Sequence, residues 1–164
     1  MTRDILLKLF EHNNWANIQI IQICSTLSDE QLDAEPQSAT HGSIRNTLTH
    51  LVTSQRSYLA LLTLPVAERP NTPLEFAELE ESARLSGEGL LALIRDEHNF
   101  PKDRLRTRDD YYVEPWVVMV QIINHATEHR EQIKNMLSSL GVTPPDIDGW
   151  DYGLATNTLV PIAA

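Results

Sequence analysis

Apolar residues recur along most of this chain at the three- and four-residue spacing of amphipathic α-helices. Four long segments show this pattern, at residues 4–27, 43–62, 72–96 and 115–140. The stripe predicted to be buried in the first segment comprises Ile5, Leu6, Leu9, Asn13, Ala16, Ile20 and Ile23. Since each segment has one apolar face to bury against the others, we predict an all-α protein, a four-helix bundle.

Residues that begin and end helices occur at the edges of these segments. Ser28 is predicted to cap a short helical turn at residues 29–32, and Ser43 to cap the second long helix. The sequence Thr72-Pro73-Leu74-Glu75 has the form of a capping box with proline at the first helical position, so the third helix is predicted to begin there. Gly141 has the form of a C′ residue that ends the fourth helix.

The connections between the helices differ in length. The long link between the second and third helices, against the short link between the first and second, allows a crossover connection. Residues 99–113 are predicted to form a short hairpin or a packed loop. Residues 146–164, which include Trp150 and Tyr152, are predicted to form an irregular tail draped over the bundle. The length of 164 residues suits a single domain at 1–164.

Composition and charge exclude two classes of partner. A formal net charge of −10 repels phosphate backbones, so no nucleic acid is expected to bind. The basic residues between Lys102 and Arg108 precede two aspartates, and we interpret them as a solvated connector rather than as a grip for an anionic ligand. The apolar runs are too short to span a membrane, and the N-terminal residues lack the pattern of a signal peptide.

Three small residues inside the predicted helices are informative. Cys24 is the single cysteine, which precludes an internal disulfide and predicts a cytoplasmic protein with a small buried thiol. Gly87 and Gly89 weaken the middle of the third helix. Either close contact with another helix or a local kink would explain these two glycines.

His125 and His129 suggest a chemical role for the fourth helix. Their i, i+4 spacing directs both imidazoles the same way, beside the apolar stripe that includes Ile122 and Ile133. Buried imidazoles need partners for their ring nitrogens, and a divalent metal ion meets that need because neutral imidazole is a common ligand. Two ligands make a weak site, so a third is expected from another segment.

His50, in the second long segment, is the best third ligand. It lies at the edge of that helix's apolar stripe, and Thr47, Ser54 and Ser57 follow the same line along the helix. Such a line is typical of a polar pocket wall within a bundle. The alternative is a single boundary histidine that bonds to a neighbouring carbonyl group.

Three segments carry a resemblance to a known family. They are Asn13-Asn14-Trp15-Ala16-Asn17, His41-Gly-Ser-Ile-Arg-Asn-Thr-Leu-Thr-His50-Leu and Asn124-His125-Ala-Thr-Glu-His129-Arg-Glu-Gln132. The chain resembles the DinB family of bacterial metal-binding four-helix bundles over nearly its whole length. The resemblance implies an up-down-down-up bundle, a homodimer, and a metal held by His50, His125 and His129. Glu128 and Glu131 depart from the family's usual residues beside the ligands.

The predicted ligand set defines the chemistry. Three neutral histidines leave at least one position open on a divalent ion, which we expect to be zinc or nickel, with manganese or iron as alternatives. Gln121 and Gln132 are predicted to hold the histidines by hydrogen bonds, and Thr47 and Ser54 to line the pocket. His12 either borders this pocket or packs elsewhere. Glu128 and Glu131 are interpreted as surface acids or as partners of Arg130 and Lys134.

Members of the wider family include transferases and isomerases that use low-molecular-weight thiols. The resemblance therefore implies a thiol-dependent S-transferase with a small-molecule substrate. Two alternatives stay open from the residues themselves. One is a metal-dependent hydrolase, because an open site can lower the pKa of bound water toward about 7. The other is a non-enzymatic metal-binding dimeric bundle.

Overall fold

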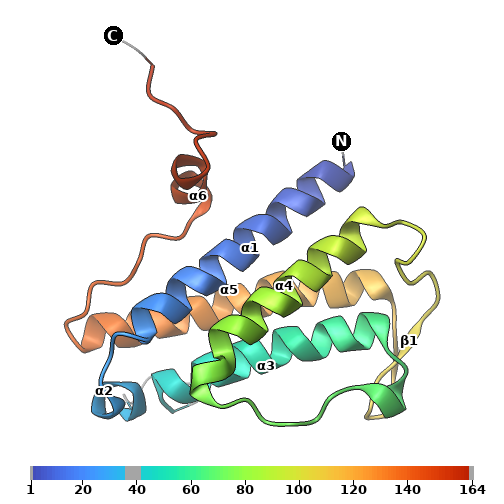
Figure 1. Cartoon of the computed structure of the whole chain (residues 1–164), viewed down its shortest axis with the longest axis horizontal. Coiled ribbons are helices and arrows are strands. Elements are labelled where there is room, and N and C mark those ends of the chain that lie inside the picture. Colours follow the sequence, from blue (N-terminus) through green and yellow to red (C-terminus); the bar gives the residue numbers. More distant parts are fainter. Residues whose placement is uncertain (1, 36–41, 163–164) are drawn as a thin grey trace.

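The computed structural model describes residues 2–35 and 42–162, and most of these residues are helical. The long helices are α1 (Thr2–Cys24), α3 (Ile44–Thr63), α4 (Leu79–Arg95) and α5 (Pro115–Ser139). The short elements are α2 (Asp29–Asp33), η1 (Val66–Glu68), η2 (Phe76–Glu78), β1 (Leu105–Arg106), β2 (Tyr112–Val113) and α6 (Gly149–Ala155). The prediction of an all-α bundle is confirmed (Figure 1). The sequence also predicts a polar loop from Pro36 to Gly42, and all of this loop except Gly42 lies outside the described residues.

Each long helix packs against two others, and the contacts give their relative directions (Figure 1). Helix α1 runs antiparallel to α4, because Arg3 bonds to the carbonyl of Ile94 while Gln22 bonds to Glu80. Helices α3 and α4 run parallel, so the chain between them returns along the bundle as a long crossover. Helix α3 runs antiparallel to α5. Within the described part of the chain, none of the helices combines the length and apolar character that crossing a membrane requires.

The helix ends follow the predicted caps except at α4. The Ser28 and Ser43 hydroxyls accept hydrogen bonds from backbone N–H groups in the first turns of α2 and α3. The prediction that the third long helix begins at residues 72–75 is wrong, since α4 begins at Leu79 after the single turn η2. The carbonyl of Thr72 accepts a hydrogen bond from Arg56, which holds this segment extended against α3.

The segments on either side of α5 are more regular than a loop and a tail. Residues 99–113 contain the hairpin β1–β2, as one of the two interpretations predicted. The C-terminal segment contains α6, so the prediction of an irregular tail is wrong there. Tyr152 of α6 packs on Trp15 with ring centroids 5.4 Å apart, whereas Trp150 is 71% exposed. The segment therefore contacts α1 through Tyr152 and leaves Trp150 in solvent.

The core consists of two apolar clusters. One surrounds Ile20, Leu48 and Ile133, and the other surrounds Phe10, Leu90 and Ile122. The predicted stripe of α1 is partly wrong, because Ile5 and Leu9 are exposed while Phe10 is fully buried. Helix α1 therefore buries a face rotated from the expected one near its N-terminus. Cys24 is buried as predicted, and burial raises the pKa of its thiol to about 12.

A layer of buried polar side chains joins all four long helices between the two apolar clusters. The guanidinium of Arg130 in α5 donates to the side-chain oxygens of Asn13 and Asn17 in α1, at 2.8 and 2.7 Å. Asn17 donates to Gln55 of α3 at 2.8 Å, and Gln55 donates to Ser86 of α4 at 2.9 Å. This polar layer satisfies groups that would otherwise be buried without partners.

Arg130 is a buried cation with neutral partners. Arg130 is 4% exposed, and no carboxylate within residues 2–35 and 42–162 forms an ion pair with it. Burial lowers its pKa to about 10, so it remains protonated at neutral pH. Of the alternatives predicted for Glu128 and Glu131, a pairing with Arg130 is therefore not found among the described residues, whereas both acids are exposed as predicted. Glu131 pairs instead with Lys134.

Close contact between helices explains both glycines in α4. A Cβ atom at Gly87 would lie 2.7 Å from Cγ of Asn14 in α1, and a Cβ atom at Gly89 would lie 2.5 Å from Cδ2 of Leu59 in α3. Glycine at these positions lets α4 approach α1 and α3 more closely than alanine would. The alternative of a local kink is not needed, because α4 is continuous from Leu79 to Arg95.

We predict that Gly87→Ala lowers the free energy of unfolding by about 1–2 kcal/mol, because the added methyl group displaces the Asn14 amide. Alanine is the better helix former, so without this contact the substitution would stabilise the protein by roughly 1 kcal/mol. Urea denaturation of both proteins measures the difference.

Two further variants separate the contact from other effects of alanine at Gly87. Gly149→Ala adds a methyl group where no atom lies within 4 Å, and it should leave stability unchanged or slightly raised. Gly87→Ala should lower the free energy of unfolding by less in an Asn14→Ala background, because the amide that the new methyl group displaces is then absent. Equal costs in the two backgrounds would contradict the proposed contact.

We predict that Arg130→Met lowers the free energy of unfolding by about 3 kcal/mol, since it leaves the oxygens of Asn13 and Asn17 buried without their donor. Lys134→Met, on the same helix, removes an equal charge from a surface pair and should change stability by less than about 1 kcal/mol. Thermal and urea unfolding compare the two. Similar losses of stability in both variants would show that the polar layer contributes little to the free energy of unfolding.

Candidate metal centre

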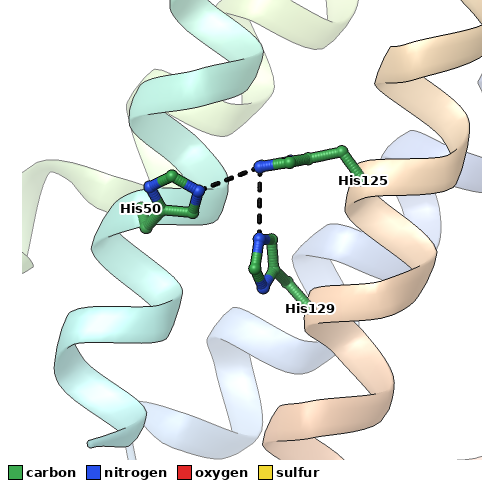
Figure 2. A group of neighbouring side chains, drawn as sticks. All are labelled: His50, His125 and His129. Atoms are coloured by element: carbon green, nitrogen blue, oxygen red, sulfur yellow. Dashed lines mark hydrogen bonds between the residues drawn. The ribbon is translucent and has the colours of Figure 1, made fainter. Parts of the chain in front are cut away.

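The Nε2 atoms of three histidines converge between α3 and α5. Nε2 of His125 lies 2.9 Å from Nε2 of His50 and 3.1 Å from Nε2 of His129. Figure 2 shows the His50 ring, from α3, facing the two rings that project from α5. All three potential ligand atoms lie within 4.8 Å of one another. The structure thus brings together the three residues that the sequence singled out.

Helix geometry explains how α5 contributes two of these rings. His125 and His129 are one turn apart, so both side chains leave the same face of α5 toward α3. His129 is 5% exposed, and His50 and His125 are half-buried. The cluster is therefore buried on one side and reachable from solvent on the other.

Gln132 fixes the orientation and the tautomer of His129. The side-chain oxygen of Gln132 lies 2.7 Å from Nδ1 of His129. Because a carbonyl oxygen only accepts, Nδ1 carries the proton and the lone pair of His129 is on Nε2, facing His125. This arrangement is the one required of a histidine that ligates through Nε2.

The geometry of the three nitrogens fits a divalent ion. Ligand nitrogens about 2.0–2.1 Å from a tetrahedral zinc ion lie about 3.3 Å from each other, close to the separations of His125 from His50 and from His129. Hydrogen bonding alone satisfies the cluster poorly. Nε2 of His125 has either one proton or one lone pair, yet it meets two other Nε2 atoms at 2.9 and 3.1 Å. A cation shared by three lone pairs satisfies all three nitrogens together.

Among the described residues, Tyr58 is an aromatic neighbour of the cluster. The ring of Tyr58 lies edge-on to the ring of His125, with centroids 5.7 Å apart. Glu128 and Glu131 are exposed, in agreement with their interpretation as surface acids. In the described part of the chain, the only group of ligand-type side chains with metal-site spacing is the three histidines, so the donors are all neutral.

The other predicted site residues differ in their positions. Ser54 is half-buried on α3, one turn after His50. Thr47 is fully buried, and its hydroxyl donates to the carbonyl of Ser43 at 2.8 Å within its own helix. Gln121 is exposed, and among the described residues no contact joins it to the cluster. His12 packs with Trp15 and Tyr152, and its Nε2 lies 2.9 Å from the carbonyl oxygen of Ile147.

Sequence reasoning missed two residues beside the site. Arg130 follows His129 in α5 yet is directed into the core, and Tyr58 borders His125 from two turns beyond His50. A signal for Arg130 existed, because Asn13 in a buried stripe needs a hydrogen-bond partner from another helix. Tyr58 had no comparable signal, since its neighbour becomes apparent only when α3 and α5 are aligned.

A helical bundle with three converging imidazoles defines a class of metal-binding proteins. Comparison with known proteins identifies the family: the chain belongs to the DinB family, whose model matches residues 1–158. The chain is also similar to "Protein DinB" of Bacillus subtilis (strain 168), with 29% identity in an alignment 164 positions long that covers 92% of this chain and 93% of that protein. The resemblance inferred from the sequence motifs is confirmed.

We predict that His50→Ala, His125→Ala and His129→Ala each reduce bound divalent metal from about one ion per chain to a small fraction of that. Each substitution removes one of three ligands, and the remaining two make a weak site. Metal analysis after dialysis against a limiting concentration of metal measures the stoichiometry.

The control for this experiment is a histidine outside the cluster. His98→Ala, in the exposed segment after α4, should retain the full stoichiometry. Gln132→Leu should keep the three ligands but weaken the affinity by about 10- to 100-fold, because the orienting hydrogen bond is lost. Full metal retention in all three ligand variants would disprove the assignment.

Proposed function

We propose that this protein is a metal-dependent enzyme in which His50, His125 and His129 hold a divalent ion, zinc or nickel, and that it transfers the sulfur of a small thiol to an electrophile. The observation that supports this proposal most directly is the convergence of the three Nε2 atoms. Three neutral protein ligands suit a catalytic site better than a structural one, because structural zinc sites take four ligands and favour thiolates.

The bound ion would supply an open coordination position and enough positive charge to favour the thiolate form of a small thiol, which is its nucleophilic form. In the transfer itself the thiol loses its proton to solvent or buffer. Its sulfur forms a bond to an electrophilic carbon, and the leaving group departs with the electron pair of the bond that breaks. No oxidant or reductant is required.

The protein's own groups serve orientation more than proton transfer. Gln132 holds the His129 ring, and the ring of Tyr58 limits the space beside His125. The carboxylates nearest in sequence, Glu128 and Glu131, are exposed. Thiol transfer needs little help from a buried general base, whereas hydrolysis benefits from one within hydrogen-bond reach. This difference favours thiol transfer over metal-dependent hydrolysis.

We also propose that the protein acts as a homodimer. Several large apolar side chains are exposed on α1 and on the segment that contains α6: Ile5, Leu9, Trp150, Leu154, Val160 and Ile162. A single small domain rarely leaves so many apolar side chains in solvent over neighbouring elements. A second copy of the chain would bury this surface.

We predict that the cobalt-substituted protein develops a sulfur-to-metal charge-transfer band when it is titrated with low-molecular-weight thiols. The band should saturate with thiol, because the thiol occupies one open position for each bound ion. Absorption spectroscopy in the near ultraviolet measures it.

Two variants make this titration specific. Glu128→Gln should keep both cobalt and the band, since Glu128 is exposed and outside the ligand set. His129→Ala should lose both. If several thiols give no band in protein that retains cobalt, thiol transfer is rejected, and an ester and amide hydrolysis screen then separates a hydrolase from a non-enzymatic metal-binding protein.

A further inference from the structure

A cavity of about 200 Å³ lies where the C-terminal half of α3 meets the link from α3 to α4 and the β1–β2 hairpin. Its lining includes Ser57 and Tyr58 of α3, Arg69 from the link to α4, and Thr107 and Arg108 from the β1–β2 hairpin. Tyr58 is the connection to the metal centre, because its ring also meets the ring of His125 at 5.7 Å. Tyr58 thus contacts both the cavity and one histidine of the cluster.

The two arginines of this cavity have only neutral hydrogen-bond partners in the described part of the chain. Arg69 donates to the carbonyls of Leu64 and Arg106, at 3.0 and 2.7 Å. Arg108 donates to the carbonyls of Arg69 and Pro70, at 2.6 and 3.2 Å, and to the side chain of Asn71 at 3.2 Å. Neither guanidinium meets a carboxylate there, although the chain has a formal net charge of −10.

The other arginines of the hairpin region show the more usual arrangement. Arg104 pairs with Glu114 at 2.7 Å, and Arg106 pairs with Asp110 at 2.5 Å. Burial, and then the charge of Arg108, lower the pKa of Arg69. Two like charges therefore lie close together at one cavity, uncompensated by the acidic side chains that are plentiful elsewhere.

Both guanidiniums keep donors for a ligand after their bonds to the protein are counted. Arg69 uses Nε and Nη1, which leaves Nη2, and Arg108 uses Nη1 and Nη2, which leaves Nε. The hydrogen bonds to backbone carbonyls fix both planar groups in position. Fixed, planar and positively charged donors are what a carboxylate or a phosphate group binds best.

We propose that this cavity binds the carboxylate or phosphate end of a small anionic ligand through Arg69 and Arg108, a role for Arg108 that replaces its interpretation as part of a solvated connector. A volume of about 200 Å³ holds such a group with a few further atoms, and is smaller than pockets that enclose a whole drug-sized molecule. The further statement that this ligand is the substrate rests on the proposed function. The substrate would be bound by its anionic end, with the rest of the molecule extending past Tyr58 toward the histidines.

The test is an NMR titration of the full-length protein that follows the Nε–H signals of its arginines. Succinate is added in one arm and inorganic phosphate in the other, at constant ionic strength maintained with chloride. We expect saturable shifts at Arg69 and Arg108, and the arm with the tighter binding identifies the class of anion.

Three variants make the test specific. Arg108→Gln should weaken binding at least tenfold. Arg108→Lys keeps the charge without the forked donors and should weaken binding less than Arg108→Gln does. This variant controls for a collapse of the loop caused by loss of the charge. Arg104→Gln removes the same charge from the same connector, at a side chain paired with Glu114, and should leave affinity within twofold of wild type.

Two results would overturn the proposal. One is the absence of saturable shifts in both arms, and the other is equal weakening by Arg108→Gln and Arg104→Gln, which would indicate general attraction by charge. His129→Ala separates this inference from the proposed function, because it removes a ligand without touching the cavity. Anion binding that survives in His129→Ala supports the subsite even if the thiol titration fails.

Discussion

The buried guanidinium of Arg130 is the constraint on which the rest of this bundle depends. Arg130 is 4% exposed and pairs with no acid among the described residues, so hydrogen bonds must satisfy its charge. The acceptors include Asn13 and Asn17 of α1. Asn17 continues the network to Gln55, and Gln55 to Ser86. Apolar contacts alone would let the helices rotate or slide with modest loss. The hydrogen bonds of the polar layer form at one rotation and one register of the four helices.

The metal centre follows from that fixed rotation. Successive residues of an α-helix are about 100° apart, so an α5 that directs Arg130 toward α1 directs its neighbour His129 toward a different helix. That helix is α3, and His125 lies on the same face one turn earlier. Gln55 joins the same network from α3, five residues after His50 and therefore about 140° round the helix, so an α3 that directs Gln55 into the polar layer directs His50 to a different side. The interactions that bury Arg130 thus also align the ligands from two helices.

The arginines of this acidic protein have distinct structural tasks. Several form exposed pairs with carboxylates, such as Arg84 with Glu81 and Glu88. Arg56, Arg69 and Arg108 instead donate to backbone carbonyls of the long crossover between α3 and α4. These bonds hold an extended segment that has little regular structure of its own. They also keep positive charge at the end of the bundle where Tyr58 meets His125.

The sequence by itself determined the elements of this protein and the chemistry of its candidate ligands. Helical periodicity, the Ser28 and Ser43 caps and the i, i+4 pair on α5 are local features, and local geometry dictates them. Tertiary structure decided which faces meet. In the folded protein Phe10 is buried in place of Leu9, and α4 begins at Leu79. Arg130 is directed into the core, and Gln121 is exposed to solvent. Each of these outcomes depends on partners distant in sequence, and periodicity within one helix contains no information about them.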